Sequence, residues 1–184
     1  MSTMHWDLTQ WATRSYLFDE VCAGEDGLAE GIREQAAEAG VPQEHHHHLS
    51  DILNTIDNLQ GVPEDVQEDM RAIYQVLAEA EAQVHDSEVD HTHFHEVGEG
   101  SHIQSVLEVC LAVRSLKPKR ITATAVQVGS GQINCAHGLM DIPAPATAAI
   151  LARGIPVFEP RLEGERCTPT SAAVIYHFVE EFLD

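Results

Sequence analysis

One long amphipathic segment constrains the fold of this chain more than any other feature. From Pro63 and Glu64 to about His85, apolar residues recur at steps of three and four: Val66, Met70, Ile73, Tyr74, Leu77, Ala80 and Val84. This spacing places them along one side of an α-helix, and the early acids suit the positive end of the helix dipole. Since such a stripe is stable only when it is buried, we expect other elements to pack against this helix.

The remaining pattern predicts an α/β (α+β) fold, with a helical N-terminal half followed by a small mixed sheet and its packed helices. Further helices are expected at about 28–39, 51–59, 101–115, 145–153 and 169–182, and short strands at 91–97, 119–128, 132–135 and 155–158. Residues 1–44 are expected to form a weakly ordered or helical arm, because the apolar face of 28–39 is mostly alanine. Residues 45–184 are expected to form the main domain.

The charge of the chain is acidic and uneven. Ten Lys and Arg residues stand against 30 Asp and Glu among 184 residues, and residues 1–100 hold 22 of the acids, three of the bases and nine of the twelve histidines. A formal net charge of −20 repels nucleic-acid phosphates and anionic membrane surfaces, so neither is expected as a partner. No apolar run approaches the ~18 residues of a membrane span, and the first ten residues do not resemble a signal peptide. We therefore expect a cytoplasmic location.

A run of four histidines follows Glu44 and leads into the helix that Ser50 is expected to cap. Its short length and internal position argue against an affinity tag. Imidazole binds nickel, zinc, copper and iron, so the run is a candidate metal site, with ligands His45, His46, His47 and His48. A solvated loop that binds metal only adventitiously explains the same residues, and the spacing alone does not choose between the two interpretations.

A second histidine-rich segment ends at Glu96. If it forms a strand, a period of two places His91, His93 and His95 on one face and Glu96 on the other. Three imidazoles at intervals of ~6–7 Å along one strand do not easily share one tetrahedral ion, whereas two of them and a ligand from elsewhere can. A polar strand face is the alternative. Because another histidine cluster exists, a metal site is favoured, and all four residues are candidate ligands.

Three further features could contact an anionic substrate or support a site. The segment Thr168–Thr170 begins a helix, where hydroxyls and free N–H groups can bind an anion or only cap the helix. Lys119 and Arg120, with Lys117, form the only basic cluster, which suits either a phosphate or a helix C-terminus. His137 lies in a loop before a rigid proline-rich connection. The sequence contains no HExxH, zinc-type cysteine spacing, Walker A, GxGxxG or GxSxG motif.

Taken in order, these segments resemble the LarC family, the nickel insertion proteins that complete the nickel-pincer nucleotide cofactor. The resemblance covers about residues 45–178 and rests on five motifs: His47–Ile52, Leu77–His85, His93–Gly98, His137-Gly138 with Pro143–Thr147, and Thr168–Thr170. The third motif is the most specific. By this resemblance, residues 45–184 correspond to the N-terminal domain of the family.

The resemblance implies a function. The family inserts nickel into a pyridinium bisthiocarboxylic acid mononucleotide, forming a carbon–nickel bond, and uses CTP with Mg²⁺ or Mn²⁺. An active member is thus a lyase-class nickel chelatase or cyclometallase, with Ni²⁺ and the pincer nucleotide precursor as its ligands. Applied to this sequence, the catalytic or metal-relaying residues are His93, His95, Glu96 and His137. The histidines from His45 to His48 recruit the metal, and the groups that receive the nucleotide are Thr168, Thr170, Lys119 and Arg120.

The chain also departs from the family pattern. Its first 40 residues lack the usual opening strand and glycine-rich loop, and Ser101 and Ser105 stand where family members usually have aspartates. It ends before the part that resembles a CTP-binding domain, so a separate C-terminal chain is an expected partner, as is a second copy in a homo-oligomer. Two alternatives stay open: a non-catalytic nickel-binding chaperone or storage module, and a degenerate member of the family.

Overall fold

The computed structural model describes residues 2–135 and 137–183. Ala136, which precedes His137 in the loop predicted from the sequence, lies outside the described residues, as do both terminal residues. The helices are α1 (Arg14–Cys22), α2 (Leu28–Glu38), α3 (Leu49–Asp57), α4 (Glu64–His85), α5 (Gly100–Leu116), α6 (Pro145–Leu151) and α7 (Pro169–Phe178), with short 3₁₀ helices η1 (Val89–His91) and η2 (Glu96–Gly98). The strands are β1 (Thr3–Trp6), β2 (Arg120–Ala123), β3 (Gly129–Ser130), β4 (Gln132–Cys135), β5 (Gly138–Asp141), β6 (Gly164–Glu165) and β7 (Glu181–Phe182).

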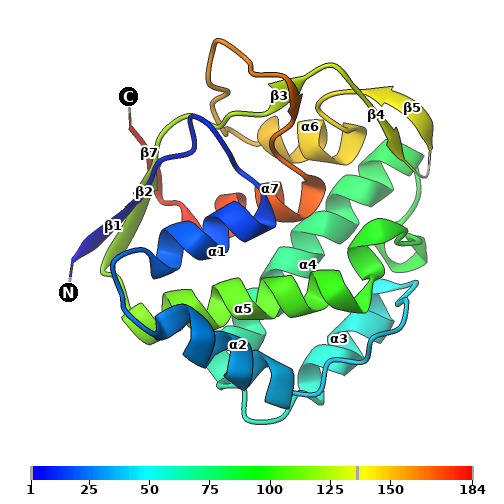
Figure 1. The fold of residues 1–184 in the computed structure, drawn as a ribbon. Helices are drawn as coiled ribbons and strands as arrows, with labels where there is room; N and C mark the ends of the chain where they lie inside the picture. Colours follow the sequence, from blue (N-terminus) through cyan, green and yellow to red (C-terminus); the bar gives the residue numbers. More distant parts are fainter. Residues whose placement is uncertain (1, 136, 184) are drawn as a thin grey trace.

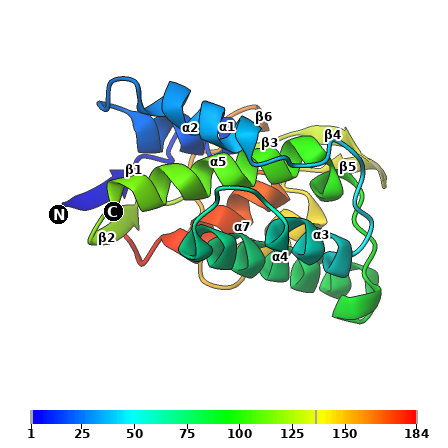
Figure 2. The same cartoon turned by 90° about the horizontal axis from the view of Figure 1, so that it is seen from below.

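Helix α4 is the centre of the core. The predicted stripe is buried: Val66, Met70, Ile73, Tyr74 and Leu77 are inaccessible and Ala80 is 1% exposed, while Val84 packs at the edge of the core. Helices α3, α5, α6 and α7 all pack against α4. Helix α5 in turn lies between α4 and the pair formed by α1 and α2 (Figure 2). The prediction of a buried helical stripe is therefore confirmed.

Among the described residues, the strands form three small sheets. Strands β1, β2 and β7 make a parallel sheet in the order β1-β2-β7, with Thr3 opposite Arg120, and both chain ends lie beside it (Figure 1). Strands β3 and β6 pair antiparallel, and β4 and β5 form a hairpin. Seven helices with small mixed sheets in the described part of the chain confirm the predicted α/β class. The sequence pattern missed β1, because that strand is fixed by a partner far along the chain.

The predicted strand at 91–97 is wrong. The segment instead runs from η1 to η2 through irregular backbone. Thr92 is 1% exposed, and its hydroxyl donates to the Glu88 carbonyl at 3.0 Å. The Phe94 side chain is inaccessible, and its N–H donates to the His47 carbonyl at 2.7 Å. The segment therefore bonds to the loop before α3 and joins none of the described sheets.

Residues 3–44 share the core of the molecule. Leu17 and Phe18 of α1 and Ile32 of α2 are buried, and both helices pack on α5. Trp6 of β1 is inaccessible. The domain boundary at residue 44 stays a prediction. In the described parts of the chain, no helix is both long and apolar enough to cross a membrane.

One buried acid ties three helices together. Asp69 of α4 accepts hydrogen bonds from Nε and Nη2 of Arg114 on α5, at 2.6 and 2.7 Å. Its Oδ1 atom also lies 2.8 Å from Nε2 of His177 on α7. The Asp69 side chain is 3% exposed and that of Arg114 is 45% exposed. Burial acts to raise the pKa of Asp69, but the hydrogen bonds and charges of Arg114 and His177 outweigh it, so the pKa is lowered.

We predict that Asp69→Ala lowers the free energy of unfolding by about 2–3 kcal/mol. This is below the ~3–5 kcal/mol of a fully buried pair, because Arg114 can regain water. Since the folded-state pKa is lowered, the contribution of the carboxylate is present above its unfolded pKa of about 3.9 and is lost as the pH falls through the lower folded value. Urea unfolding at pH 7 and at pH 3, with Asp69→Asn alongside, measures both effects. The exposed Glu68→Ala on the same helix is the control, and an Asp69→Asn difference that is constant down to pH 3 would contradict the account.

Candidate metal centre

Two loops that are far apart in the sequence are joined by backbone hydrogen bonds. His46 N–H donates to Gly98 O at 2.8 Å, Phe94 N–H to His47 O at 2.7 Å, and Gly100 N–H to Glu44 O at 3.1 Å. We call this pairing of residues 44–47 with 94–100 the loop clasp. A Cβ atom added at Gly98 would lie 2.0 Å from the His46 carbonyl oxygen. The clasp therefore depends on glycine at that position.

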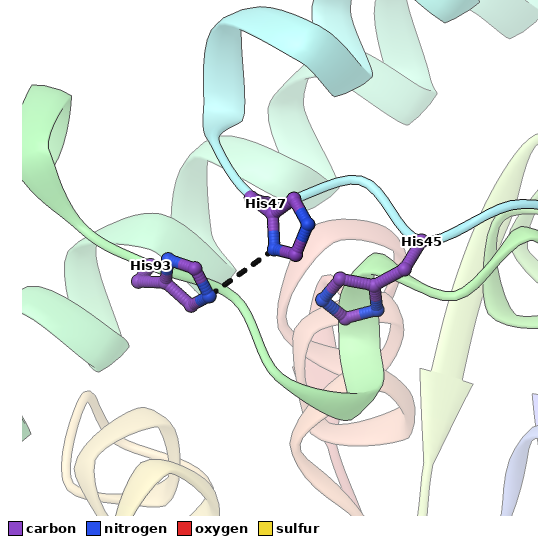
Figure 3. A group of neighbouring side chains, drawn as sticks. All are labelled: His45, His47 and His93. Carbon is purple, nitrogen blue, oxygen red and sulfur yellow. Dashed lines mark hydrogen bonds between the residues drawn. The ribbon is translucent and has the colours of Figure 1, made fainter.

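The clasp brings together a first group of three imidazoles, which we call the outer triad: His45, His47 and His93 (Figure 3). One ring nitrogen from each lies within 4.8 Å of the others. Nδ1 of His47 and Nε2 of His93 are 3.2 Å apart. One of these nitrogens must carry a proton and the other must accept it, so a metal ion that binds both nitrogens displaces that proton.

His45 has a different environment within the outer triad. Its Nε2 atom lies 2.9 Å from Phe94 O, and its Nδ1 atom lies 3.1 Å from Oε1 of Glu99. Both partners are acceptors, so the ring must give up one contact before it can ligate an ion. If Nδ1 keeps its bond to Glu99, that carboxylate orients the ring and leaves Nε2 for the metal, an arrangement common around metal-ligating histidines.

A second group, the inner triad, consists of His85, His95 and His137. His85 is the last residue of α4, His95 precedes η2, and His137 lies in the turn between β4 and β5. Their ligand nitrogens also lie within 4.8 Å of one another. The sequence suggested His95 and His137 as site residues but not His85. The signal that could have identified His85 was its place at the end of the motif Leu77–His85.

The electrostatics of His93 and His95 favour neutral imidazole. Desolvation, followed by the charges of His47 and His48, lowers the pKa of His93. Desolvation and the neighbouring His137 and His93 likewise lower the pKa of His95. Only neutral imidazole binds a metal ion, so His93 and His95 are held toward the state that ligation needs.

The inner triad borders a cleft of about 300 Å³. Of the predicted site residues, the cleft is lined by His95, Glu96, His137, Thr168 and Thr170. The sequence did not predict that Arg14, Glu81, His102 and Glu165 line it as well. These four lie on separate elements with no shared spacing, so no local pattern could have grouped them.

The other predicted site residues lie elsewhere. His46 is 6% exposed, and its Nδ1 atom is 3.2 Å from Gly98 O. His48, not Ser50, is the N-cap of α3, with Nδ1 3.3 Å from Thr92 O. His91 is exposed beside Glu88, with Nδ1 and Oε2 3.3 Å apart.

The predicted basic cluster and the two serines are also placed by the structure. Arg120 pairs with Glu181, and the backbone N–H of Lys119 donates to Ser2 O; neither residue lines the cleft. Ser105 lies on α5, where its Oγ atom is 3.4 Å from Nη1 of Arg14 and donates to Ser101 O at 3.0 Å. Ser105, which stands where family members usually have an aspartate, therefore contacts Arg14 in the wall of the cleft.

Comparisons with known proteins identify the family of this chain. A family model described as a nickel insertion protein matches residues 21–184. The chain belongs to this family. The resemblance to nickel insertion proteins, which the motifs indicated, is therefore confirmed. No solved structure matches the chain.

Individual relatives support the assignment to the nickel insertion family. A Dictyoglomus thermophilum protein is 41% identical over 139 residues, which cover 74% of this chain and 36% of that protein. The pyridinium-3,5-bisthiocarboxylic acid mononucleotide nickel insertion proteins of Staphylococcus epidermidis and Staphylococcus saprophyticus are 38% and 40% identical, over 75% and 79% of this chain and 34% and 37% of their own lengths. The chain thus spans about a third of the length of the curated relatives it matches.

We predict that Gly98→Ala opens the loop clasp. The new methyl group would lie 2.0 Å from the backbone oxygen of His46, so one loop must shift, at a cost of about 1–3 kcal/mol. The outer triad then loses its geometry, and its Ni²⁺ affinity falls. The matched control is Gly31→Ala, where an added Cβ has no neighbour within 4 Å and the helix interior should gain up to about 1 kcal/mol. Thermal unfolding and nickel titration measure the two effects, and equal nickel affinities for both variants would show that the clasp does not hold the triad.

Proposed function

We propose that this chain handles the metal in nickel insertion: it captures Ni²⁺ and presents it to a pyridinium-3,5-bisthiocarboxylic acid mononucleotide bound in the cleft. The observation that carries the proposal is the inner triad at the edge of that cleft. Imidazole is a suitable ligand for Ni²⁺, and the named relatives act on this nucleotide. Nickel is a substrate in this scheme and leaves the chain in the product.

The six imidazoles of the two triads form one continuous track. In the order His45, His47, His93, His95, His137 and His85, successive ring centroids are 4.5, 4.8, 5.4, 5.1 and 4.8 Å apart. An ion held by one ring is therefore within reach of the next, so it can move by exchange of one ligand at a time. We propose that the outer triad recruits the ion and that His93 and His95 pass it to the inner triad.

The reaction in the cleft needs a base. Formation of a carbon–nickel bond on the pyridinium ring breaks a carbon–hydrogen bond, and the proton must be accepted by another group while the charge of Ni²⁺ is retained by the product. We assign this role to the carboxylate of Glu96, which lines the cleft next to His95. His137 is the second candidate, as a ligand or as a proton carrier. Because nickel stays Ni²⁺ and the ring loses only a proton, this step needs no oxidant or reductant.

For the use of CTP we infer a part of the protein but no individual residues. We infer that CTP, with Mg²⁺ or Mn²⁺, is used by a part of the protein outside these 184 residues or by a separate C-terminal chain, since the named relatives are about three times longer than the matched region. A cytoplasmic location and assembly of several copies remain predictions.

Nickel titration of single variants tests the two triads. We predict that His47→Ala and His137→Ala each remove binding at one triad, with losses greater than the ~10–100-fold caused by removing an outer-shell partner. The control is His91→Ala, because His91 is exposed and outside both triads. Isothermal calorimetry measures affinity and stoichiometry. If all three variants bind Ni²⁺ like the native chain, neither triad is a site.

Insertion itself is tested with the uncharged pincer nucleotide, Ni²⁺, Mg²⁺ and CTP. We expect metallated product, detected by mass spectrometry, when the chain is combined with the C-terminal part of a full-length relative, and a large loss of product with His95→Ala or Glu96→Gln. Product formed by the chain alone would show that no second part is needed. Tight nickel binding without product in either combination would instead identify a nickel carrier.

A further inference from the structure

The helix ends that line the cleft differ in electrostatic sign. Its lining includes the first turns of three helices: Arg14 is the first residue of α1, His102 the third residue of α5, and Thr170 the second residue of α7. The N-terminus of a helix carries partial positive charge. The lining also includes Glu81 and Val84, in the last turns of α4. The C-terminus of a helix carries partial negative charge and favours a cation, so the inner triad, with His85, lies where a metal ion is favoured.

Thr170 gives independent support for a ligand at the helix N-termini. It is 1% exposed, it lines the cleft, and its hydroxyl has no hydrogen-bond partner among the described residues. Helix α7 does not need this hydroxyl, because Thr168 and Ser171 already complete the cap: Ser171 N–H donates to Thr168 Oγ1 at 3.3 Å and Thr168 N–H to Ser171 Oγ at 2.9 Å. A buried hydroxyl without a partner lowers stability. It gains a partner when an acceptor enters the cleft.

Arg14 supplies the charge. Among the described residues that line the cleft it is the only lysine or arginine. Its guanidinium is 3.4 Å from Ser105 Oγ, and no described carboxylate lies within ion-pair distance of it. Burial lowers the pKa of Arg14, but a guanidinium stays charged at neutral pH. A partly buried cation without a counter-ion favours an anion in the cleft.

We propose that Arg14, Thr170 and the first turn of α7 bind the phosphate monoester of a pyridinium mononucleotide. This inference rests on the proposed function for the identity of the nucleotide, and it sets the orientation of the substrate, with the phosphate at the helix N-termini and the ring beside the inner triad. It gives the phosphate a different site from Lys119 and Arg120, which lie outside the cleft.

The acids of the cleft add a selectivity requirement. Glu81, Glu96 and Glu165 line the same space. These groups oppose a simple anion but attract the positive ring of a pyridinium nucleotide. We therefore expect the cleft to bind a pyridinium mononucleotide more tightly than inorganic phosphate.

The test uses nicotinic acid mononucleotide as the probe, titrated calorimetrically into the full chain without nickel. Arg14→Ala and Thr170→Val should each weaken binding by about 10–100-fold, as expected for loss of a hydrogen bond to a charged group. The controls are Thr147→Val and Arg161→Ala. Thr147 is equally buried and its hydroxyl also lacks a described partner, but it does not line the cleft. Both valine variants should be at least as stable as the native chain, so a loss of binding in Thr170→Val cannot be attributed to unfolding.

The outcomes separate this inference from the proposed function. A loss of affinity in Arg14→Ala and Thr170→Val but in neither control supports the phosphate site. Equal binding of the riboside that lacks the phosphate, unchanged binding in the two cleft variants, or no binding of the mononucleotide at all would overturn it. Nickel titration of the same variants should be unchanged. If nucleotide binding depends on Arg14 while the triads bind no Ni²⁺, the phosphate site stands and nickel handling fails.

Discussion

The candidate metal centre depends on the loop clasp. His45 and His47 are almost 50 residues from His93 in the sequence. They are aligned by the backbone hydrogen bonds of residues 44–47 with 94–100 and by the side-chain contacts of His45 with Phe94 O and Glu99. The side chains of His46 and His48 reinforce this pairing through Gly98 O and Thr92 O. Alternate histidines of the run therefore have different roles: His46 and His48 hold the loop in place, and His45 and His47 belong to the outer triad. The backbone thus separates four identical residues into two that support the loop and two that are candidate metal ligands.

The clasp also links the outer triad to the cleft. His93 and His95 are two residues apart, and the irregular backbone between η1 and η2 directs one toward His47 and the other toward His137. On a regular strand the two rings would share one face. The two rings nevertheless stay adjacent, with centroids 5.4 Å apart, so His93 and His95 connect two neighbouring groups of ligands into one track.

The features that the sequence predicted are those with local causes. The α4 stripe follows from periodicity within one helix, and the hairpin strand β4 from the flanking glycines, so both could be placed. The strand expected at 91–97 failed because its alternating pattern is satisfied by hydrogen bonds to a loop almost 50 residues earlier. Strand β1 was missed because its pairing partner begins at Arg120. The motifs identified His95, Glu96 and His137, but Arg14, His102 and His85 come together only through the packing of α1, α5 and α4.

The cleft and the Asp69 network lie toward opposite ends of the same three helices. Asp69 is near the start of α4, Arg114 near the end of α5 and His177 near the end of α7, whereas the end of α4 and the starts of α5 and α7 line the cleft. A hydrogen-bonded buried acid fixes the three helices relative to one another at one end. The cleft end can then carry unpaired polar groups and an uncompensated arginine, which destabilise the free protein but are ready for a ligand. Stability and binding are therefore assigned to different ends of one helical framework.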